Sequence, residues 1–172
     1  MRIEAHGIRA ELPAGWEGRL GRRQPGTMTG PRGRAGTDGA TGAAMTEVVG
    51  EDTGPVLHMG NFALPEDRGD FGSGAVDLMG TGHLLLVLVE YGPDSVGTAL
   101  FPTVSSVPRL TGRMFSNQAL QRVQRGQAGA QRFFTLNGRA FCLYAVVGDE
   151  RETGAMATTA NEVTRQIQVS PA

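Results

Sequence analysis

The segment that decides the fold reads Gln131-Arg-Phe-Phe-Thr-Leu-Asn-Gly-Arg-Ala-Phe-Cys-Leu-Tyr-Ala-Val-Val147. At its centre, Asn137-Gly138 is the pair most typical of a two-residue type I′ turn, because both turn positions need a positive φ. Such a turn predicts three cross-strand pairs: Leu136 with Arg139, Phe134 with Phe141, and Phe133 with Cys142. Both faces of the hairpin are then apolar, so a helix or a second layer must cover each face.

The segments before this hairpin predict further strands. Val56–Leu64 and His83–Tyr91 are apolar on both alternating sets of positions, and the second is expected to be a central strand beside 139–147. Near the start, Ile8–Leu12 alternates with polar neighbours and is followed by Pro13-Ala14-Gly15. We expect it to form a first hairpin with Trp16–Leu20.

Two segments can supply helices to cover the sheet. Thr159 and Glu162 have the spacing of a capping box, and the apolar spacing after Met156 predicts a C-terminal helix over 158–168. Ser116 is a candidate N-cap for a helix that ends near Gly126. The fold class is therefore α+β: an antiparallel β-sheet packed with two or more helices, in a single domain over residues 1–172.

The segment 21–46 interrupts this pattern. It is rich in glycine and threonine and has almost no large apolar side chain, so it buries too little surface to offset its ordering entropy. We expect a flexible loop. It is either a tolerated insertion or a binding arm that carries four arginines: Arg22, Arg23, Arg32 and Arg34.

The composition excludes several classes of protein. The formal net charge is −1, so charge alone identifies no partner. The chain has no lysine, which excludes a lysine Schiff base and a Walker lysine, and its Gly, Ala and Arg content is typical of a GC-rich genome of the actinobacterial kind. One cysteine, no membrane-length apolar run and no signal-peptide core predict a cytoplasmic protein.

The charges are segregated along the chain. Residues 38–94 carry ten acidic residues and one arginine, whereas 95–148 carry six arginines and no acidic residue. If the arginines converge, they form a positive partner-binding surface, and four are candidates for it: Arg109, Arg113, Arg122 and Arg125. The partner is expected to be another protein, or the acidic block of a second copy in self-association. The alternative is that the acidic block of the same chain folds against them.

A glycine-rich, acidic loop provides a second candidate site, with Asp67, Arg68, Asp70 and Ser73. Its acids would repel a phosphate, their spacing does not match a calcium loop, and Ser73 is not in a nucleophile-elbow motif. The simpler interpretation is a surface turn that leads into a short helical or extended piece through Ala75–Met79.

Other chemistry has little support in the sequence. His6, His58 and His83 lack metal-ligand spacing, and we interpret His58 and His83 as structural. Cys142 lies within an apolar strand, where we expect an inert thiol. We therefore expect no cofactor and no metal. Nucleic acid is not favoured as a partner, because the hairpin register places Phe133 and Phe134 in the core rather than on a stacking surface.

The opening Leu12-Pro13-Ala14-Gly15-Trp16 after a short alternating strand, together with the strand order and the closing helix, resembles the PsbP-like α/β domains. That family includes photosystem accessory proteins, a nuclear-import cofactor, actinobacterial lipoproteins and chaperones of secreted effectors. The resemblance implies a fold used mostly for binding proteins. We therefore expect a non-catalytic interaction module, an adaptor, chaperone or assembly component, and not an enzyme. The alternatives are a small-molecule or lipid-binding domain and an enzyme of unidentified class.

Overall fold

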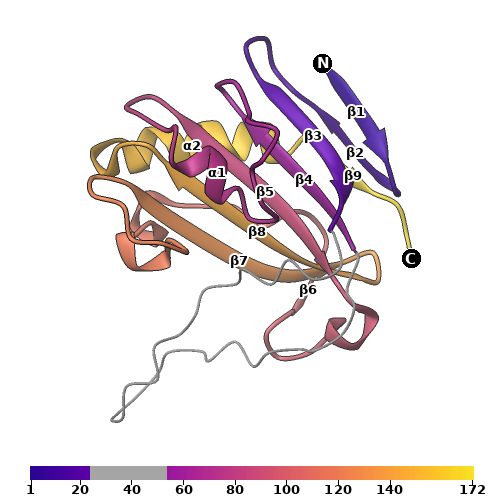
Figure 1. Cartoon of the computed structure of the whole chain (residues 1–172). Helices are drawn as coiled ribbons and strands as arrows, with labels where there is room; N and C mark the ends of the chain where they lie inside the picture. Colours follow the sequence, from indigo (N-terminus) through magenta and orange to yellow (C-terminus); the bar gives the residue numbers. More distant parts are fainter. Residues whose placement is uncertain (24–53) are drawn as a thin grey trace.

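The structure, a computed structural model, describes residues 1–23 and 54–172. Its fold is of the α+β class, with two β-sheets and few helices (Figure 1). Most of the predicted 21–46 loop lies outside the described residues. Gly21 and Arg22, however, belong to a strand, where they pair with Val56 and Pro55. The strand therefore continues further than predicted.

The larger sheet has six strands in the order β3-β4-β5-β8-β7-β6. Their bounds are β3 Glu17–Arg22, β4 Pro55–Gly60, β5 Leu84–Tyr91, β6 Thr103–Val104, β7 Ala128–Leu136 and β8 Arg139–Val147. All neighbours are antiparallel except β6 and β7, which are parallel, so the prediction of a purely antiparallel sheet is wrong at this edge. The two predicted central strands, β5 and β8, are confirmed at the middle of the sheet.

The β7–β8 hairpin has the predicted turn and register. Asn137 and Gly138 have φ of 52° and 76°, as a type I′ turn requires. Leu136 pairs with Arg139, and the other predicted pairs follow from it. A two-residue turn leaves no freedom in register, which is why a local signal was sufficient here.

The smaller sheet has the order β1-β2-β9, with bounds Arg2–Ala5, Ile8–Glu11 and Ile167–Val169. The predicted first hairpin is wrong, because β2 pairs with β1 and β9, whereas β3 pairs with β4. The observed turn is His6-Gly7, with φ of 52° and 71°. Pro13-Ala14-Gly15, expected as the turn of that hairpin, instead lies in the connection from one sheet to the other.

The principal helix is α2, Thr153–Thr164, which begins and ends earlier than predicted. It ends there because Ile167 belongs to β9, and the predicted capping-box residue Thr159 lies inside the helix. The short α1 spans Ser73–Val76. Four single 3-10 turns complete the described helices: η1 Pro93–Ser95, η2 Gly112–Met114, η3 Asn117–Ala119 and η4 Glu150–Glu152.

The predicted helix from Ser116 to Gly126 is wrong. Only the 3-10 turn η3 forms within it, and Ser116 exchanges backbone hydrogen bonds with Gly129 at the edge of β7. Phe115, just before this edge, packs on one face of the sheet, whereas Leu120 packs with the core on the other face. A continuous helix over this segment could not place both side chains in their cores.

Each face of the six-stranded sheet has its own core. One face packs against α2 and the smaller sheet, and the other packs beneath α1 and the 117–127 segment (Figure 1). Both faces of β5 and β8 are buried, as their apolar composition predicted. Among the described residues, none of the helices has the length and hydropathy needed to cross a membrane.

Candidate interaction surface

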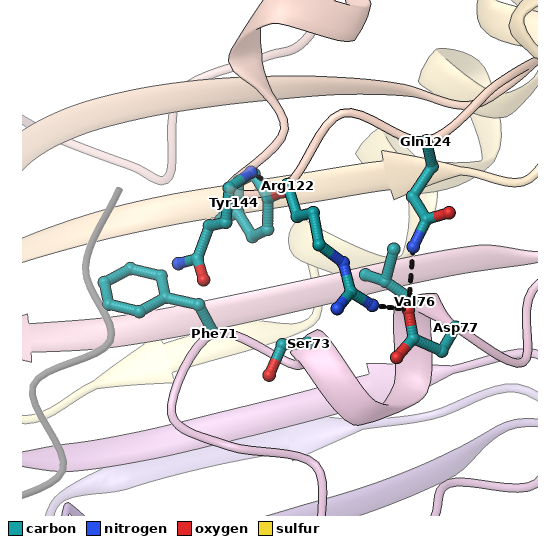
Figure 2. Close-up of a pocket in the computed structure, with 8 residues that line it drawn as sticks. Phe71, Ser73, Val76, Asp77, Arg122, Gln124 and Tyr144 are labelled. Atoms are coloured by element: carbon teal, nitrogen blue, oxygen red, sulfur yellow. Dashed lines mark hydrogen bonds and ion pairs between the residues drawn. The ribbon is translucent and has the colours of Figure 1, made fainter. Parts of the chain in front are cut away.

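The end of α1 and the 117–127 segment meet on the face of the large sheet opposite to α2. Asp77, at the C-terminal end of α1, forms an ion pair with Arg122 and accepts a hydrogen bond of 2.7 Å from Gln124 Nε2 (Figure 2). Arg122 and Gln124 come from the 117–127 segment, so these contacts join segments about 45 residues apart. The hydrogen bond from Arg122 to the Asp77 carboxylate raises the pKa of Arg122.

A buried glutamine fixes the same two segments to each other beneath this ion pair. The Gln127 Nε2 group donates to the carbonyl oxygens of Val76 at 3.1 Å and Met79 at 3.3 Å. These carbonyls lie at and just beyond the end of α1, where the last carbonyls of a helix lack part of their usual backbone partners. The Val76 carbonyl also accepts a hydrogen bond of 3.2 Å from the Met79 backbone, so Gln127 adds to the backbone contacts at the end of α1 and holds the 117–127 segment against it.

A small recess lies between the two segments. It has room for about 20 Å³, about the space of one water molecule. Its base is Tyr144, whose hydroxyl accepts a hydrogen bond of 3.3 Å from the Gln121 backbone and whose pKa is raised by burial to about 12. Phe71 contacts the Tyr144 ring edge-on, with 6.2 Å between the ring centroids. The recess is too small for an organic ligand unless one of the two segments moves.

Two exposed apolar residues are next in the chain to the members of the ion pair. Leu78 is 61% exposed and Val123 is 67% exposed, and each follows a member of the Asp77–Arg122 pair in the sequence. We call these four residues together with Gln124 the Asp77–Arg122 surface. It combines aliphatic side chains with a guanidinium held in place by a carboxylate.

The structure separates the four candidate arginines into two pairs. Arg109 and Arg113 belong to a segment held against α2, since Leu110 exchanges two hydrogen bonds of 2.8 Å with the side chain of Asn161. Arg122 and Arg125 belong to the segment on the opposite face of the sheet. Arg122 is also neutralised by Asp77, an acid from the 38–94 block. The alternative in which the acidic block folds against the arginines therefore describes Arg122.

The candidate loop residues mostly contact their own loop. Arg68 Nη1 donates to the carbonyls of Pro65 at 3.0 Å and Glu66 at 3.1 Å. The carbonyl of Asp67 lies where a Cβ on Gly74 would be, only 2.0 Å away, so the loop is closed tightly on itself. Burial raises the pKa of Asp70. Of the eight candidate residues, only Ser73 and Arg122 line the same recess.

The histidines and the cysteine have structural surroundings. His58 is buried under this loop, with Nε2 3.0 Å from the Gly69 carbonyl, and burial lowers its pKa to about 4. Cys142 is buried, which raises its pKa to about 12. His83 stacks on Phe62 with 4.8 Å between ring centroids. Within residues 1–23 and 54–172, no group of three or more His, Cys, Asp or Glu side chains has the arrangement of a metal site.

An open hollow of about 430 Å³ lies at the smaller sheet, around the His6-Gly7 turn. It is lined by residues 4–9 of the β1–β2 hairpin and by Gln168, Val169 and Ser170. Hydrogen bonds from Arg9 and Arg2 lower the pKa of Glu4 in this hollow to about 2. The lining is mainly polar, unlike the apolar cavity that a lipid needs.

Asp77, Leu78, Val123, Gln124 and Gln127 were not candidates from the sequence. The contacts between 76–79 and 121–127 have no local signal, because neither a periodicity nor a turn links residues so far apart. The segregation of charge showed only that acids and arginines had to meet somewhere. Comparison with family models, with curated proteins and with solved structures finds no match for this chain.

Proposed function

We propose that this protein is a non-catalytic interaction module, an adaptor, chaperone or assembly component, that binds another protein through the Asp77–Arg122 surface. The observation that carries the proposal is the exposure of Leu78 and Val123, each of which follows in the chain a member of the exposed Asp77–Arg122 ion pair. Single exposed aliphatic side chains are common, and the support here is their combination with an arginine, a residue that is enriched in protein interfaces.

Arg122 is suited to a second partner. A guanidinium has five N–H donors, and the contact with Asp77 uses the Nη2 group. The side chains of Arg122 and Asp77 are 68% and 45% exposed, so their pair contributes only about 0–1 kcal/mol to stability. A carboxylate of a partner can therefore share Arg122, while apolar side chains of that partner cover Leu78 and Val123.

The segments that carry this surface are fixed by hydrogen bonds with buried side chains. Gln127 fixes the end of α1, and the Tyr144 hydroxyl fixes the backbone of Gln121. Binding at a surface held in this way costs little ordering entropy, which favours recognition of a partner over a change of shape.

A photo-crosslinking amino acid placed at Leu78 or at Val123 tests the proposal in cells that contain the native partners. The matched control position is Glu162, which is exposed on α2 and lies on the other face of the sheet. We expect the same crosslinked protein from positions 78 and 123, none from 162, and loss of the product when Arg122→Glu is added. Equal products from all three positions, or none from 78 and 123, would refute the proposal.

We also propose that the fold is PsbP-like and that the protein acts in the cytoplasm. The α+β organisation, the α2 helix near the C-terminus and the inter-sheet connection formed by Leu12–Trp16 support the family proposal. The single, buried thiol supports a reducing compartment. Cell fractionation tests the location, and a protein found only outside the cytoplasm would contradict it.

A further inference from the structure

The strand β1 has a free edge. Met1 and Leu12 exchange two backbone hydrogen bonds of 2.7 Å, so the odd-numbered residues of β1 bond to β2. The N–H and C=O groups of Arg2 and Glu4 therefore point away from β2, and no group among the described residues bonds to them there. Figure 1 shows β1 as the outermost strand of the smaller sheet.

Exposed and half-buried side chains alternate along β1, and this alternation bears on which strand can pair with its free edge. Arg2 and Glu4 are exposed, whereas Ile3 and Ala5 are half-buried towards the core. The two residues whose backbone groups are free thus carry opposite charges. They are also two positions apart, the distance between successive hydrogen-bonding positions on one strand edge.

We propose that β1 pairs with β1 of a second copy of this chain, antiparallel, about a twofold axis at Ile3. Only Arg2 and Glu4 can form the hydrogen-bonded pairs, so three symmetric registers are possible. The first places Arg2 opposite Arg2 and the second places Glu4 opposite Glu4, both with like charges in direct opposition. The third, centred on Ile3, places Arg2 of each copy opposite Glu4 of the other, which is favourable at both pairs.

This register forms four backbone hydrogen bonds and joins the smaller sheets in the order β9-β2-β1-β1-β2-β9. It also places Met1, which is 58% exposed, opposite Ala5 of the second copy. Such a self-complementary contact closes as a dimer, since both copies use the same edge. The strand is short and its interface falls below about 1,200 Å², so the dimer forms weakly and in proportion to concentration.

The other edge of the same sheet is not equivalent. The carbonyl of Val169 in β9 already accepts a hydrogen bond of 2.7 Å from the Asn137 side chain. The β6 edge of the large sheet has only two paired residues. Pairing through β1 does not involve the Asp77–Arg122 surface, so this proposal and the proposed function can fail separately.

Charge exchange tests the register. Sedimentation equilibrium is measured over the micromolar to millimolar range on the full chain, with any purification tag at the C-terminus. The wild-type chain should form dimers, whereas Arg2→Glu and Glu4→Arg, each alone, should weaken dimerisation at least tenfold. An equimolar mixture of the two variants should restore it, because every glutamate of one chain then faces an arginine of the other.

Two controls make the result specific. Glu162→Arg makes the same charge change on α2 and should leave dimerisation unchanged. Oxidation should crosslink an Ile3→Cys chain into a dimer, because Ile3 faces Ile3 across the axis, and should not crosslink Ala5→Cys. A wild-type chain that stays monomeric, single variants that dimerise like the wild type, or a mixture that stays monomeric would each overturn the proposal.

Discussion

Replacing Arg139 by methionine should lower the stability of the protein, because Arg139 joins the two sheets. Arg139 lies at the start of β8, and its side chain is only 9% exposed. It donates to Glu90 Oε1 at 2.8 Å and Oε2 at 2.5 Å, and to three carbonyls of the smaller sheet: His6 at 3.0 Å, Gly7 at 3.2 Å and Ser170 at 3.4 Å. One guanidinium therefore connects β5 of the large sheet with the β1–β2 turn and with the end of β9 in the smaller sheet.

The expected loss follows from what remains after the replacement. The Glu90 side chain is 16% exposed, so Arg139→Met leaves a nearly buried carboxylate without its partner. Breaking such a pair from one side costs about 3–5 kcal/mol. The double variant Arg139→Met with Glu90→Leu leaves no buried charge and should be more stable than Arg139→Met alone. Arg139→Lys keeps the charge but not the planar fork, and should fall in between.

Urea unfolding gives the measurement. Trp16 is the only tryptophan and lies in the connection between the two sheets, so its fluorescence reports on their packing, while circular dichroism reports on the whole fold. Arg132→Met, at an exposed position of β7, is the matched control and should change stability by less than about 0.5 kcal/mol. A loss below about 1 kcal/mol for Arg139→Met, or a double variant less stable than the single one, would refute the reasoning.

Three further predictions concern buried groups and glycines. Burial holds the pKa of His58 at about 4, below its ordinary 6.5. The free energy of unfolding should therefore be full above pH 6.5 and fall by about 3 kcal/mol as the pH drops to about 4. Urea unfolding of His58→Gln across this range should lack that pH-dependent loss. The thiol of Cys142, with a pKa near 12, should not react with a thiol reagent at pH 8 until the protein is unfolded, and rapid labelling of the native protein would contradict its burial. A Cβ added at Gly154 in α2 meets no atom within 4 Å, so Gly154→Ala should raise the melting temperature. A Cβ added at Gly148 would lie 1.8 Å from the Gly80 carbonyl oxygen, so Gly148→Ala should lower the melting temperature strongly. Equal melting temperatures for the two variants would refute this reasoning.

The strands whose partners are set by local chemistry were predictable from the sequence. Asn137-Gly138 fixed a register of nine residue pairs, and the apolar composition of β5 and β8 predicted their central place. The first hairpin was not predictable in the same way, since its turn is His6-Gly7, and a positive φ is uncommon for any residue other than glycine. In addition, β2 pairs with β9, which is more than 150 residues away in the sequence.

The helix boundaries and the contacts of the candidate site could not be predicted from the sequence for a related reason. The apolar spacing around Leu120 is compatible with a helix, but the chain has to cross the edge of the sheet at Ser116. Arg122 was correctly singled out as a charged residue, yet its partner Asp77 is known only from the fold. Propensity and periodicity describe a segment by itself, whereas these contacts depend on which segments the sheet brings together.

The pairing of β2 with β9 has a consequence for the order of events during synthesis. The six-stranded sheet is complete once Val147 has left the ribosome, but the smaller sheet lacks a strand until residues 167–169 follow. At about 5–20 residues per second, the time from the synthesis of β2 at residues 8–11 to that of β9 is on the order of ten seconds, and β2 has one edge unpaired throughout. During that interval the only β9 strand that β2 can pair with belongs to a neighbouring chain, so crowded polysomes give an opportunity for exchange of β9 between copies.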